Sequence, residues 1–498
     1  DPIAQNYIYD NSLYMREPQY KFIMPAKAIK FQTDRINEHV KVTRLLDGNN
    51  QDKIVASAYV SRADTNNLYD EFLNQEIAAY IRENALGKIL IIRSIEVDKN
   101  IKIANAQQLI LTETISEALK RDYTYAIYNP KSNEKIERKV LDVLLRQGFR
   151  EIIIKGQHTG RYAVNMRNPI TIFQNMDMVL KDPFSKNRKV ERALELAHQR
   201  MQWSLTDMYP GSLVLSFNSG VMHHKLIGKI TAENGVPQEP LKKRQLGPYM
   251  CVPFGKILNS MAVPNTVTKT LHTEKSFAPD LSSFRIKEYP FYSSIVNQVK
   301  TIQSFDRPVI LVDDILHKGY RMKSLDPILK ENNIQVQKLM VGLLSGRGKD
   351  LMRVQEREVD SVYFVPNLKA WFVESSQYPF IGGDGVSRNT GTIDDAFTAI
   401  NLIMPYISPL FLAGIDNEAT FNFSMVCLEN ARDIFKTIEE EYQSIFQRKL
   451  TLSRLSEAII SPKMPDIGPC LDYDRSIAPS AYMEGDIEKL IRLKGMVK

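Results

Sequence analysis

The chain has 498 residues, of which 43% are hydrophobic and 25% are charged, and its formal net charge is +7. This composition is typical of globular proteins, and the length predicts about three domains. The small positive charge does not by itself indicate a nucleic-acid partner, because phosphorylated small molecules are sufficient to account for it.

The cysteines and the ends of the chain indicate the compartment. Cys251, Cys427 and Cys470 lie far apart and form no CxxC motif. This usage predicts a reducing, cytoplasmic environment without a disulfide framework. No apolar run approaches the roughly 18 residues that a membrane span needs. The chain shows no signal-peptide pattern at its start. Because it opens with Asp1-Pro2 and no methionine, we expect a fragment or a processed form.

The N-terminal third mixes strand and helix patterns. Residues 1–20 are polar and tyrosine-rich and are interpreted as a leader or docking arm, with an ordered strap as the alternative. From 21 to 165, hydrophobic periodicity switches repeatedly between two and 3.6 residues, which indicates a mixed α/β domain. Strands are expected at 54–60, 89–97, 123–128 and 151–155, and helices at 68–84, 106–120 and 135–147.

This order of elements, with a helix that ends in Gly148-Phe149, resembles the GCN5-related N-acetyltransferase (GNAT) fold. In that family a glycine-rich turn after the central strand binds the pyrophosphate of acetyl-CoA. Here the turn has no glycine and consists of Lys102, Ile103, Ala104, Asn105 and Ala106. The resemblance implies acetyl-CoA as a cofactor and Glu96 as a general base. The alternatives are a GNAT fold kept for recognition or dimerisation, with Glu96 on a solvated face.

Residues 166–210 contain Pro169, Pro183 and a helical pattern at 190–208, and they predict a helical linker. The stretch 307–321 then combines a strand, two acids and a short loop. Val309 to Val312 are four aliphatic residues in a row, which predicts a strand buried on both faces. Asp313 and Asp314 follow at its expected end, the place where open α/β sheets bind ligands. The loop amides suit a phosphate, and the carboxylates suit ribose hydroxyls and a magnesium shell.

This stretch resembles the phosphoribosyl pyrophosphate (PRPP) loop of type I phosphoribosyltransferases, which usually ends Thr-Gly-x-Thr. Gly319 matches, whereas Lys318 and Arg321 replace the threonines. The resemblance implies a parallel-sheet domain at 211–393, in which Asp313 and Asp314 hold the ribose hydroxyls directly or through Mg²⁺. It also implies a 5′-phosphate loop of Ile315, Leu316, His317, Lys318, Gly319, Tyr320 and Arg321. The alternatives are another ligand or a plain strand-turn-helix unit.

Two further segments fit the same resemblance. The buried strand 213–217 is expected to be the first of the parallel sheet, and a pyrophosphate-binding loop follows it at Ser219, Gly220, Val221 and Met222. The polar segment 263–275 is expected to be a hairpin or a flexible lid. Its cations Lys269, His272 and Lys275 would act on the pyrophosphate, and a solvated hairpin is the alternative.

Aromatic residues near the end of this domain are candidates for stacking on a base. The segments 362–367 and 370–373 are expected to form a closing hairpin. In 6-oxopurine members of the family an aromatic side chain stacks on the base, which implies this role for Trp371, Tyr378 or Phe380. Hydrophobic closure of the sheet is the alternative.

Residues 394–498 carry helical patterns, at 394–404, 421–447, 450–459 and 484–493, and are interpreted as a cap or a dimerisation element. A homodimer is therefore expected. The leading functional prediction is a Mg²⁺-dependent phosphoribosyltransferase that uses PRPP and a small acceptor, either a nucleobase or an amine. The alternatives are a bifunctional enzyme with a GNAT-like acetyltransferase domain and a non-enzymatic nucleotide or PRPP sensor.

Overall fold

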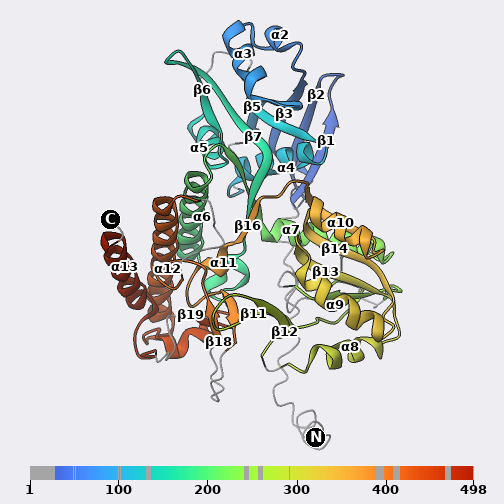
Figure 1. Ribbon diagram of the computed structural model, residues 1–498, viewed down its shortest axis with the longest axis vertical. Helices are drawn as coiled ribbons and strands as arrows, with labels where there is room; N and C mark the ends of the chain where they lie inside the picture. The colour runs from blue at the N-terminus through green and yellow to red at the C-terminus, as the bar shows by residue number, and fades with distance from the viewer. Residues whose placement is uncertain are drawn as a thin grey trace, which may run out of the picture.

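The computed structural model describes residues 29–48, 50, 52–98, 100, 103–130, 136–239, 246–255, 262–290, 292–387, 397–407, 415–465 and 473–496. The leader predicted at residues 1–20, together with Lys102 and Cys470, lies outside these ranges. The described strands form three sheets, with long C-terminal helices beside them (Figure 1). None of the described helices combines the length and apolar composition that crossing a membrane requires.

The first sheet is mixed, because β1 to β4 pair antiparallel in chain order and β4 then pairs parallel with β5. Its strands are β1 (Ile29–Arg35), β2 (Val40–Asp47), β3 (Lys53–Ala63), β4 (Lys88–Val97), β5 (Tyr123–Tyr128), β6 (Arg150–Ile154), β7 (Gln157–Gln174), β8 (Ser212–Asn218) and β16 (Ala370–Val373). Helices α4 (Ala106–Leu119) and α5 (Arg138–Arg146) pack on one face, and α2 (Leu68–Phe72) and α3 (Gln75–Asn84) on the other. The mixed α/β arrangement predicted for this region is confirmed.

Strand β8 corrects one prediction. The run 213–217 was expected to open the parallel sheet, but β8 pairs parallel with β7 in the first sheet, with Leu215 beside Thr171. Strand β16 also pairs parallel with β7, so the hairpin expected at 362–373 is wrong. A short apolar run indicates a buried strand, but long-range contacts determine which sheet that strand joins.

The second sheet is entirely parallel, in the order β10-β9-β13-β14-β15. Its strands are β9 (Met250–Pro253), β10 (Val267–Thr268), β13 (Val309–Leu316), β14 (Val336–Ser345) and β15 (Val359–Val365). Helices α8 (Ile295–Gln303) and α9 (Tyr320–Glu331) cover one face together with α10 (Gly346–Val354), and α7 (Ser219–Glu233) covers the other. A parallel sheet in this part of the chain was predicted, and the strand pairings confirm it.

The first and second sheets share one hydrophobic core. Ile310 and Val312 of β13 face the core that contains α4 and α7, whereas Val309 and Leu311 face α8 and α9. β13 is therefore buried on both faces, as its unbroken aliphatic run predicts. The continuous core fixes the first sheet against the parallel sheet.

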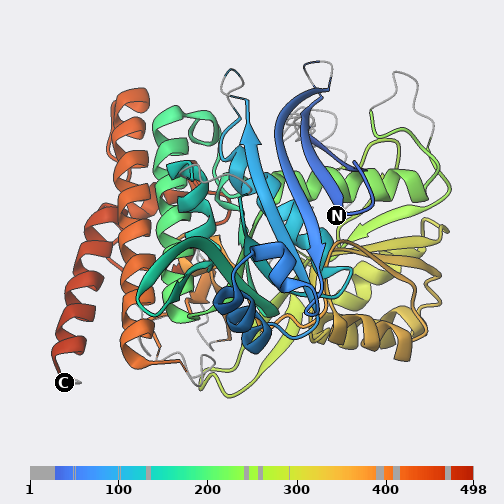
Figure 2. The same ribbon diagram turned by 90° about the horizontal axis from the view of Figure 1, so that it is seen from above.

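The third sheet has the order β12-β11-β17-β18-β19 and lies beside the C-terminal helices. Its strands are β11 (Thr273–Phe277), β12 (Phe284–Glu288), β17 (Asp384–Val386), β18 (Phe397–Ile400) and β19 (Lys463–Pro465). The helices are α6 (Arg188–Met208), α11 (Glu374–Gln377), α12 (Asn417–Phe446) and α13 (Pro479–Met496). Figure 2 shows α6, α12 and α13 side by side, with the first sheet between them and the parallel sheet.

The helical prediction for the C-terminal region is confirmed by α12 and α13 and is wrong at 394–404. There Phe397–Ile400 forms β18, a strand completed by β17 and β19 from other parts of the chain. The predicted linker 166–210 holds the end of β7 and the whole of α6. At the start of α6 the Asn187 side chain accepts from the Lys189 amide at 2.9 Å, an N-cap that sets where the helix begins.

Candidate functional site

The strand order of the parallel sheet creates a switch point between β9 and β13. From β9 the chain continues to the neighbour on one side, β10, and then returns to β13 on the other side. In open α/β sheets such a point leaves a crevice at the carboxyl ends of the two strands, where ligands bind. Gly255 follows β9, and Asp313 and Asp314 lie near the end of β13, so all three residues stand at this switch point.

The two carboxylates differ in exposure. The Asp313 side chain is 3% exposed and the Asp314 side chain is 19% exposed. The sequence predicts the acids at the end of the strand. This is wrong, because β13 continues to Leu316 and both acids lie inside it. Burial raises the pKa of Asp313 well above its usual range; Arg321 opposes this shift and Asp314 adds to it. Asp314 is thus the carboxylate that a ligand reaches more easily.

Arg321 turns back from the first turn of α9 onto the acid pair. Its guanidinium forms an ion pair with Asp313 and lies 3.5 Å from Asp314. Burial opposes a positive charge here, but Asp313, Asp314 and Asp384 together raise the pKa of Arg321. The residue predicted to bind the 5′-phosphate is therefore engaged by the predicted ribose-binding acids. The sequence does not indicate this contact, because Arg321 lies on a helix eight positions after Asp313, which lies on a strand.

Gly255 is a site residue that the sequence prediction missed. The Phe254 amide donates to the Val312 carbonyl at 2.9 Å, which brings the next residue beside the acid pair. A Cβ at position 255 would lie 1.9 Å from Asp314 Oδ1 and 2.1 Å from Asp313 Oδ1. Only glycine fits this approach of backbone to carboxylates. The available signal was a lone glycine directly after a buried strand.

His223 lies on α7, close enough to the acid pair for the Asp314 charge to act on its ring. Its ring is buried, and burial lowers its pKa to about 4, although the Asp314 charge opposes the shift. The ring is therefore neutral at pH 7. The adjacent His224 lies instead against the Gln238 side chain, at 3.3 Å, so the two histidines do not act together. In the described part of the chain no three His, Cys, Asp or Glu side chains gather as a metal site.

The predicted 5′-phosphate loop is shorter than its seven residues. Ile315 and Leu316 still belong to β13, and Tyr320 and Arg321 begin α9. His317 Nδ1 lies 3.1 Å from Ser345 Oγ, and Lys318 is exposed. Gly319 has φ +66°, and a Cβ there would lie 2.1 Å from Leu351 Cδ2. Burial lowers the pKa of His317, and the charges of Lys318 and Arg347 lower it further, so cations surround this turn.

A cavity of about 500 Å³ opens beside the first turn of α9. Its lining comes from β12 and its preceding turn and from α9: Ser282, Ser283, Phe284, Arg285, Ile286, Tyr320, Lys323 and Ser324. The Phe284 and Tyr320 rings meet edge to face, with centroids 5.2 Å apart. The cavity therefore adds two cations and a pair of aromatic rings next to the phosphate-loop turn.

The predicted pyrophosphate loop is the first turn of α7. Ser219, Gly220, Val221 and Met222 are helical because the Asn218 side chain caps the Val221 amide at 3.0 Å. Ser219 Oγ donates to Asp177 at 3.3 Å, and Met222 is buried. The predicted loop conformation is wrong, because these four residues form a helical turn that leads directly to His223.

The predicted lid is part of two sheets. Val267–Thr268 forms the edge strand β10, and Thr273–Phe277 forms β11, so the segment 263–275 is neither a hairpin nor a flap. The Lys269 amide donates to the Cys251 carbonyl at 3.0 Å. The His272 ring stacks on Tyr292 with centroids 3.7 Å apart, and Lys275 pairs with Asp384 at 3.2 Å. The segment is therefore held by backbone strand pairing and by the ion pair of Lys275, an arrangement that its polar sequence did not distinguish from a lid.

The aromatic candidates lie outside the acid-pair site. Trp371 is 44% exposed on β16 in the first sheet. Tyr378 is buried and donates to Glu374 Oε1 at 2.9 Å. Phe380 is also buried, with ring centroids 5.6 Å from Tyr473 and 5.1 Å from Tyr482. For Tyr378 and Phe380 the packing alternative is correct, because both belong to the core around α6 and α12.

The GNAT-like turn is described from Ile103 onward. Ala104 is exposed, Asn105 has φ +56° without a side-chain cap, and Ala106 begins α4. Strand β4 pairs with β5 as far as Ile92 and then continues alone on that side. Glu96 lies on this continuation and is exposed, with Ser94 Oγ donating to its carboxylate at 3.0 Å. Its environment matches the solvated-face interpretation.

No family model matches the chain. Solved structures of N-acetyltransferases are similar to its N-terminal region. The Drosophila melanogaster polyamine N-acetyltransferase has 9% identity and a TM-score of 0.19, over 25% of this chain and 74% of that one. A mosquito arylalkylamine N-acetyltransferase has 12% identity and a TM-score of 0.19, over 26% of this chain and 74% of that one. Arabidopsis thaliana NAA60 in complex with acetyl-CoA has 14% identity and a TM-score of 0.18, over 26% of this chain and 75% of that one. At these identities and TM-scores the likeness carries no information on activity.

Proposed function

We propose that the protein binds a phosphorylated ribose at the carboxyl ends of β9 and β13 and transfers the phosphoribosyl group to a small acceptor. PRPP is the proposed donor. The observation that carries this proposal is the convergence of Gly255, Asp313 and Asp314 at the switch point of a parallel sheet. The glycine lets the backbone after β9 approach both carboxylates closely, and carboxylates accept the hydrogen bonds of ribose hydroxyls.

The two acids have different roles in this proposal. Asp314, the more exposed carboxylate, accepts from the ribose hydroxyls. Asp313 is buried against Arg321 and acts as a positioning residue that holds the guanidinium in place. The amides at the turn before α9, with exposed Lys318, bind the 5′-phosphate, because a helix N-terminus carries unpaired N–H donors and a partial positive charge.

Magnesium fits this donor set through one carboxylate. Mg²⁺ keeps several waters and is commonly held by one or two carboxylates together with substrate phosphates. Asp314 supplies that carboxylate, and bound Mg²⁺ would neutralise charge on the pyrophosphate. In the transfer, the acceptor lone pair forms the bond to ribose C1 while the bond from C1 to the pyrophosphate oxygen breaks. The pyrophosphate leaves with the electron pair, so catalysis rests on positioning and charge stabilisation.

The test is pyrophosphate release in the presence of PRPP, Mg²⁺ and a panel of nucleobases and amines. Asp314→Asn should reduce turnover by about tenfold or more, since a lost hydrogen bond to a charged group is worth roughly 1.5–3 kcal/mol. Asp350→Asn is the matched control, because its carboxylate is 69% exposed on α10. Equal turnover by the wild type and Asp314→Asn would reject the assigned site.

A regulatory role is the second candidate, and the ion pair between Arg321 and Asp313 favours it. A guanidinium already neutralises one acid, which weakens the attraction of this site for a divalent cation. In that case PRPP or a nucleotide binds without turnover. Binding that depends on Asp314, combined with no pyrophosphate release from any acceptor, would support the regulatory role over the transferase.

Acetyl transfer by the N-terminal region rests on one observation: β4 extends to Val97, beyond its last pairing with β5 at Ile92, and the start of α4 has no side-chain cap. The free amides at this helix N-terminus would bind the pyrophosphate of acetyl-CoA. Acetyl-CoA titration tests it. Binding that is unchanged in Asp314→Asn and lost in Ala104→Trp would support this role, and absence of binding would remove it.

A further inference from the structure

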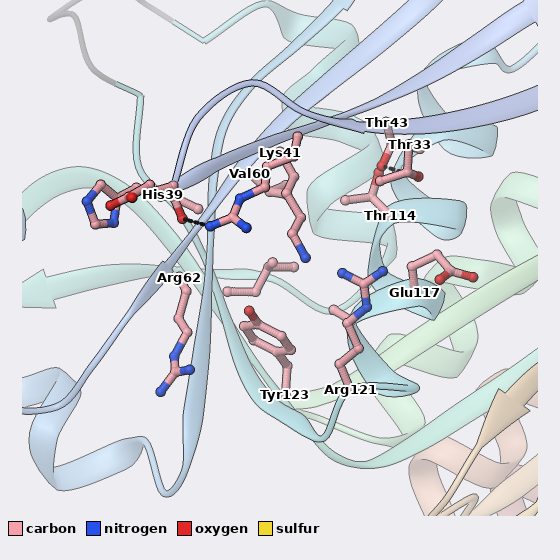
Figure 3. Close-up of a pocket in the computed structure, with 15 residues that line it drawn as sticks. Thr33, His39, Lys41, Thr43, Val60, Arg62, Thr114, Glu117, Arg121 and Tyr123 are labelled. Carbon is pink, nitrogen blue, oxygen red and sulfur yellow. Dashed lines mark hydrogen bonds between the residues drawn. The ribbon is translucent and has the colours of Figure 1, made fainter.

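A second cavity, of about 280 Å³, lies on the first sheet and shares no residue with the acid-pair site. Figure 3 shows it between β1, β2 and β3 and the C-terminal end of α4. Its charged lining residues are Arg35, Glu38, His39, Lys41, Arg62, Glu117 and Arg121, and its floor includes Val60, Leu90 and Ala118. Four permanent cations thus face two carboxylates in one small cavity.

Several of these charges already have partners. Glu117 pairs with Lys120 at 2.6 Å, outside the lining, and Arg62 pairs with Asp64 at 2.6 Å. Arg35 donates to the backbone carbonyls of residues 37 and 38, each at 3.1 Å. Lys41 and Arg121 form no ion pair with any residue in the described ranges. Arg35 likewise has no ion pair among the described residues, so the positive charge that no carboxylate neutralises lies on Arg35, Lys41 and Arg121.

The cations repel one another. The pKa of Lys41 is lowered first by burial and then by the positive charges of Arg121 and Arg35. Figure 3 shows the Lys41 ammonium and the Arg121 guanidinium directed toward a common space, with the Tyr123 hydroxyl facing it. An anion in that space would relieve the repulsion and gain charge-assisted hydrogen bonds from both cations.

Neutral donors complete the cavity. The hydroxyls of Thr33 and Thr43 lie 3.3 Å apart on neighbouring strands and both belong to the lining. Hydroxyl groups donate to phosphate oxygens in the same way as to carboxylates. Because these side chains stand on paired strands, their spacing is fixed before any ligand arrives.

We propose that this cavity is a binding site for a small polyphosphate anion, such as a free triphosphate or the phosphate end of a nucleotide. The several cations call for an anion with more than one negative charge, and guanidinium and ammonium groups are the usual phosphate partners. A volume near the lower limit of ligand pockets suits such a group and leaves no room for a long nucleic-acid strand.

Isothermal titration of the full chain with inorganic triphosphate tests this site. It should be performed in Lys318→Met, which removes the exposed cation of the proposed 5′-phosphate loop, so that the acid-pair site contributes as little as possible. Lys41→Met and Arg121→Met should each weaken binding by about tenfold or more. Lys53→Met is the matched control, because it removes the same charge from the start of β3, where Lys53 pairs with Asp98 at 3.5 Å. Binding by this variant should change less than about twofold.

Three outcomes would overturn the proposal. Equal weakening by Lys53→Met would mean that only overall charge attracts the anion. Unchanged binding in both cavity variants, with circular dichroism showing them folded, would exclude the cavity. A single-stranded oligonucleotide that binds more tightly than triphosphate and depends on Lys41 would make the cavity part of a nucleic-acid surface. Adenosine triphosphate and free triphosphate titrated in parallel distinguish the two sources of the anion.

Discussion

Arg321 is ion-paired with Asp313 and lies 3.5 Å from Asp314, so a cation of the chain itself faces the acid pair. The chain thus holds a buried positive charge beside the two carboxylates, at the place where a cationic ligand of the acids would lie. Removal of Arg321 should therefore affect both stability and ligand binding.

Arg321→Met leaves the buried Asp313 carboxylate without its cation. We expect a loss of about 3 kcal/mol in the free energy of unfolding at pH 7, because breaking a buried pair leaves an uncompensated charge. The loss should shrink as the pH falls, since protonation of Asp313 removes that charge. Urea denaturation at pH 7 and pH 5 measures this, with exposed Lys323→Met on the same helix as the control. A loss that grows toward pH 5 would contradict the assigned pairing.

Gly255→Ala places a methyl group against both carboxylates. Overpacking at such a contact costs about 2 kcal/mol, and the displaced acid pair should also lose its ligand. Gly485→Ala in α13 is the contrasting variant, because a Cβ there meets no atom within 4 Å. In that half-buried helix interior alanine should stabilise by roughly 0.5–1 kcal/mol. Equal thermal stability of the two variants would refute the proposed close approach.

His223 should make the free energy of unfolding depend on pH. Its folded pKa of about 4 lies below the unfolded value of 6.5, so the unfolded chain binds the proton first. Its contribution is complete above about pH 6.5 and is lost as the pH falls toward 4, by roughly 3 kcal/mol. Denaturation curves of the wild type and His223→Gln between pH 7.5 and 4.5 isolate this term. Exposed His39→Gln should leave the pH dependence unchanged, and parallel curves for all three proteins would contradict the burial of His223.

A buried pair joins α6 to the first residue of α11. His198 Nδ1 lies 2.5 Å from Glu374 Oε2, and neither side chain is more than 17% exposed. Burial opposes the charge, but Glu374 and Asp177 raise the pKa of His198 overall. The stability from this pair is therefore present below the unfolded pKa of about 6.5 and is lost as the pH rises through the higher folded value.

Glu374→Gln should thus cost about 3 kcal/mol in unfolding free energy at pH 6 and less at pH 9. Chemical denaturation at both values measures the difference. Exposed Glu440→Gln on α12 is the control and should change stability by less than about 0.5 kcal/mol. A cost that is the same at both pH values would show that His198 is not charged in the folded protein.

The parts of the fold that were predictable are those encoded by local pattern. The aliphatic run of β13 predicts a strand with two buried faces, and the two acids that follow the run predict a polar site at the edge of the sheet. Strand β8 has the same kind of apolar run, but its place beside β7 depends on contacts with residues more than 40 positions away. Local periodicity carries no information about that choice.

The chemistry of the site was predictable in part for the same reason. Asp313, Asp314 and Gly319 stand in one stretch and were found together. Gly255 and His223 reach the acids from separate elements, and the ion pair of Arg321 depends on how α9 turns back over β13. The segment expected to form a lid supplies strands to two sheets, and its Lys275 pairs with Asp384. A polar sequence pattern alone does not distinguish such strands from a solvated lid.

The most direct test of the phosphorylated-ribose site is isothermal titration of PRPP with and without Mg²⁺ into the wild type, Asp314→Asn and Asp350→Asn. We predict Mg²⁺-dependent binding that is retained in Asp350→Asn and weakened by about tenfold or more in Asp314→Asn. Absence of binding to the folded wild type, or binding that Asp314→Asn leaves unchanged, would contradict the assignment of the β9–β13 switch point as a phosphoribosyl site.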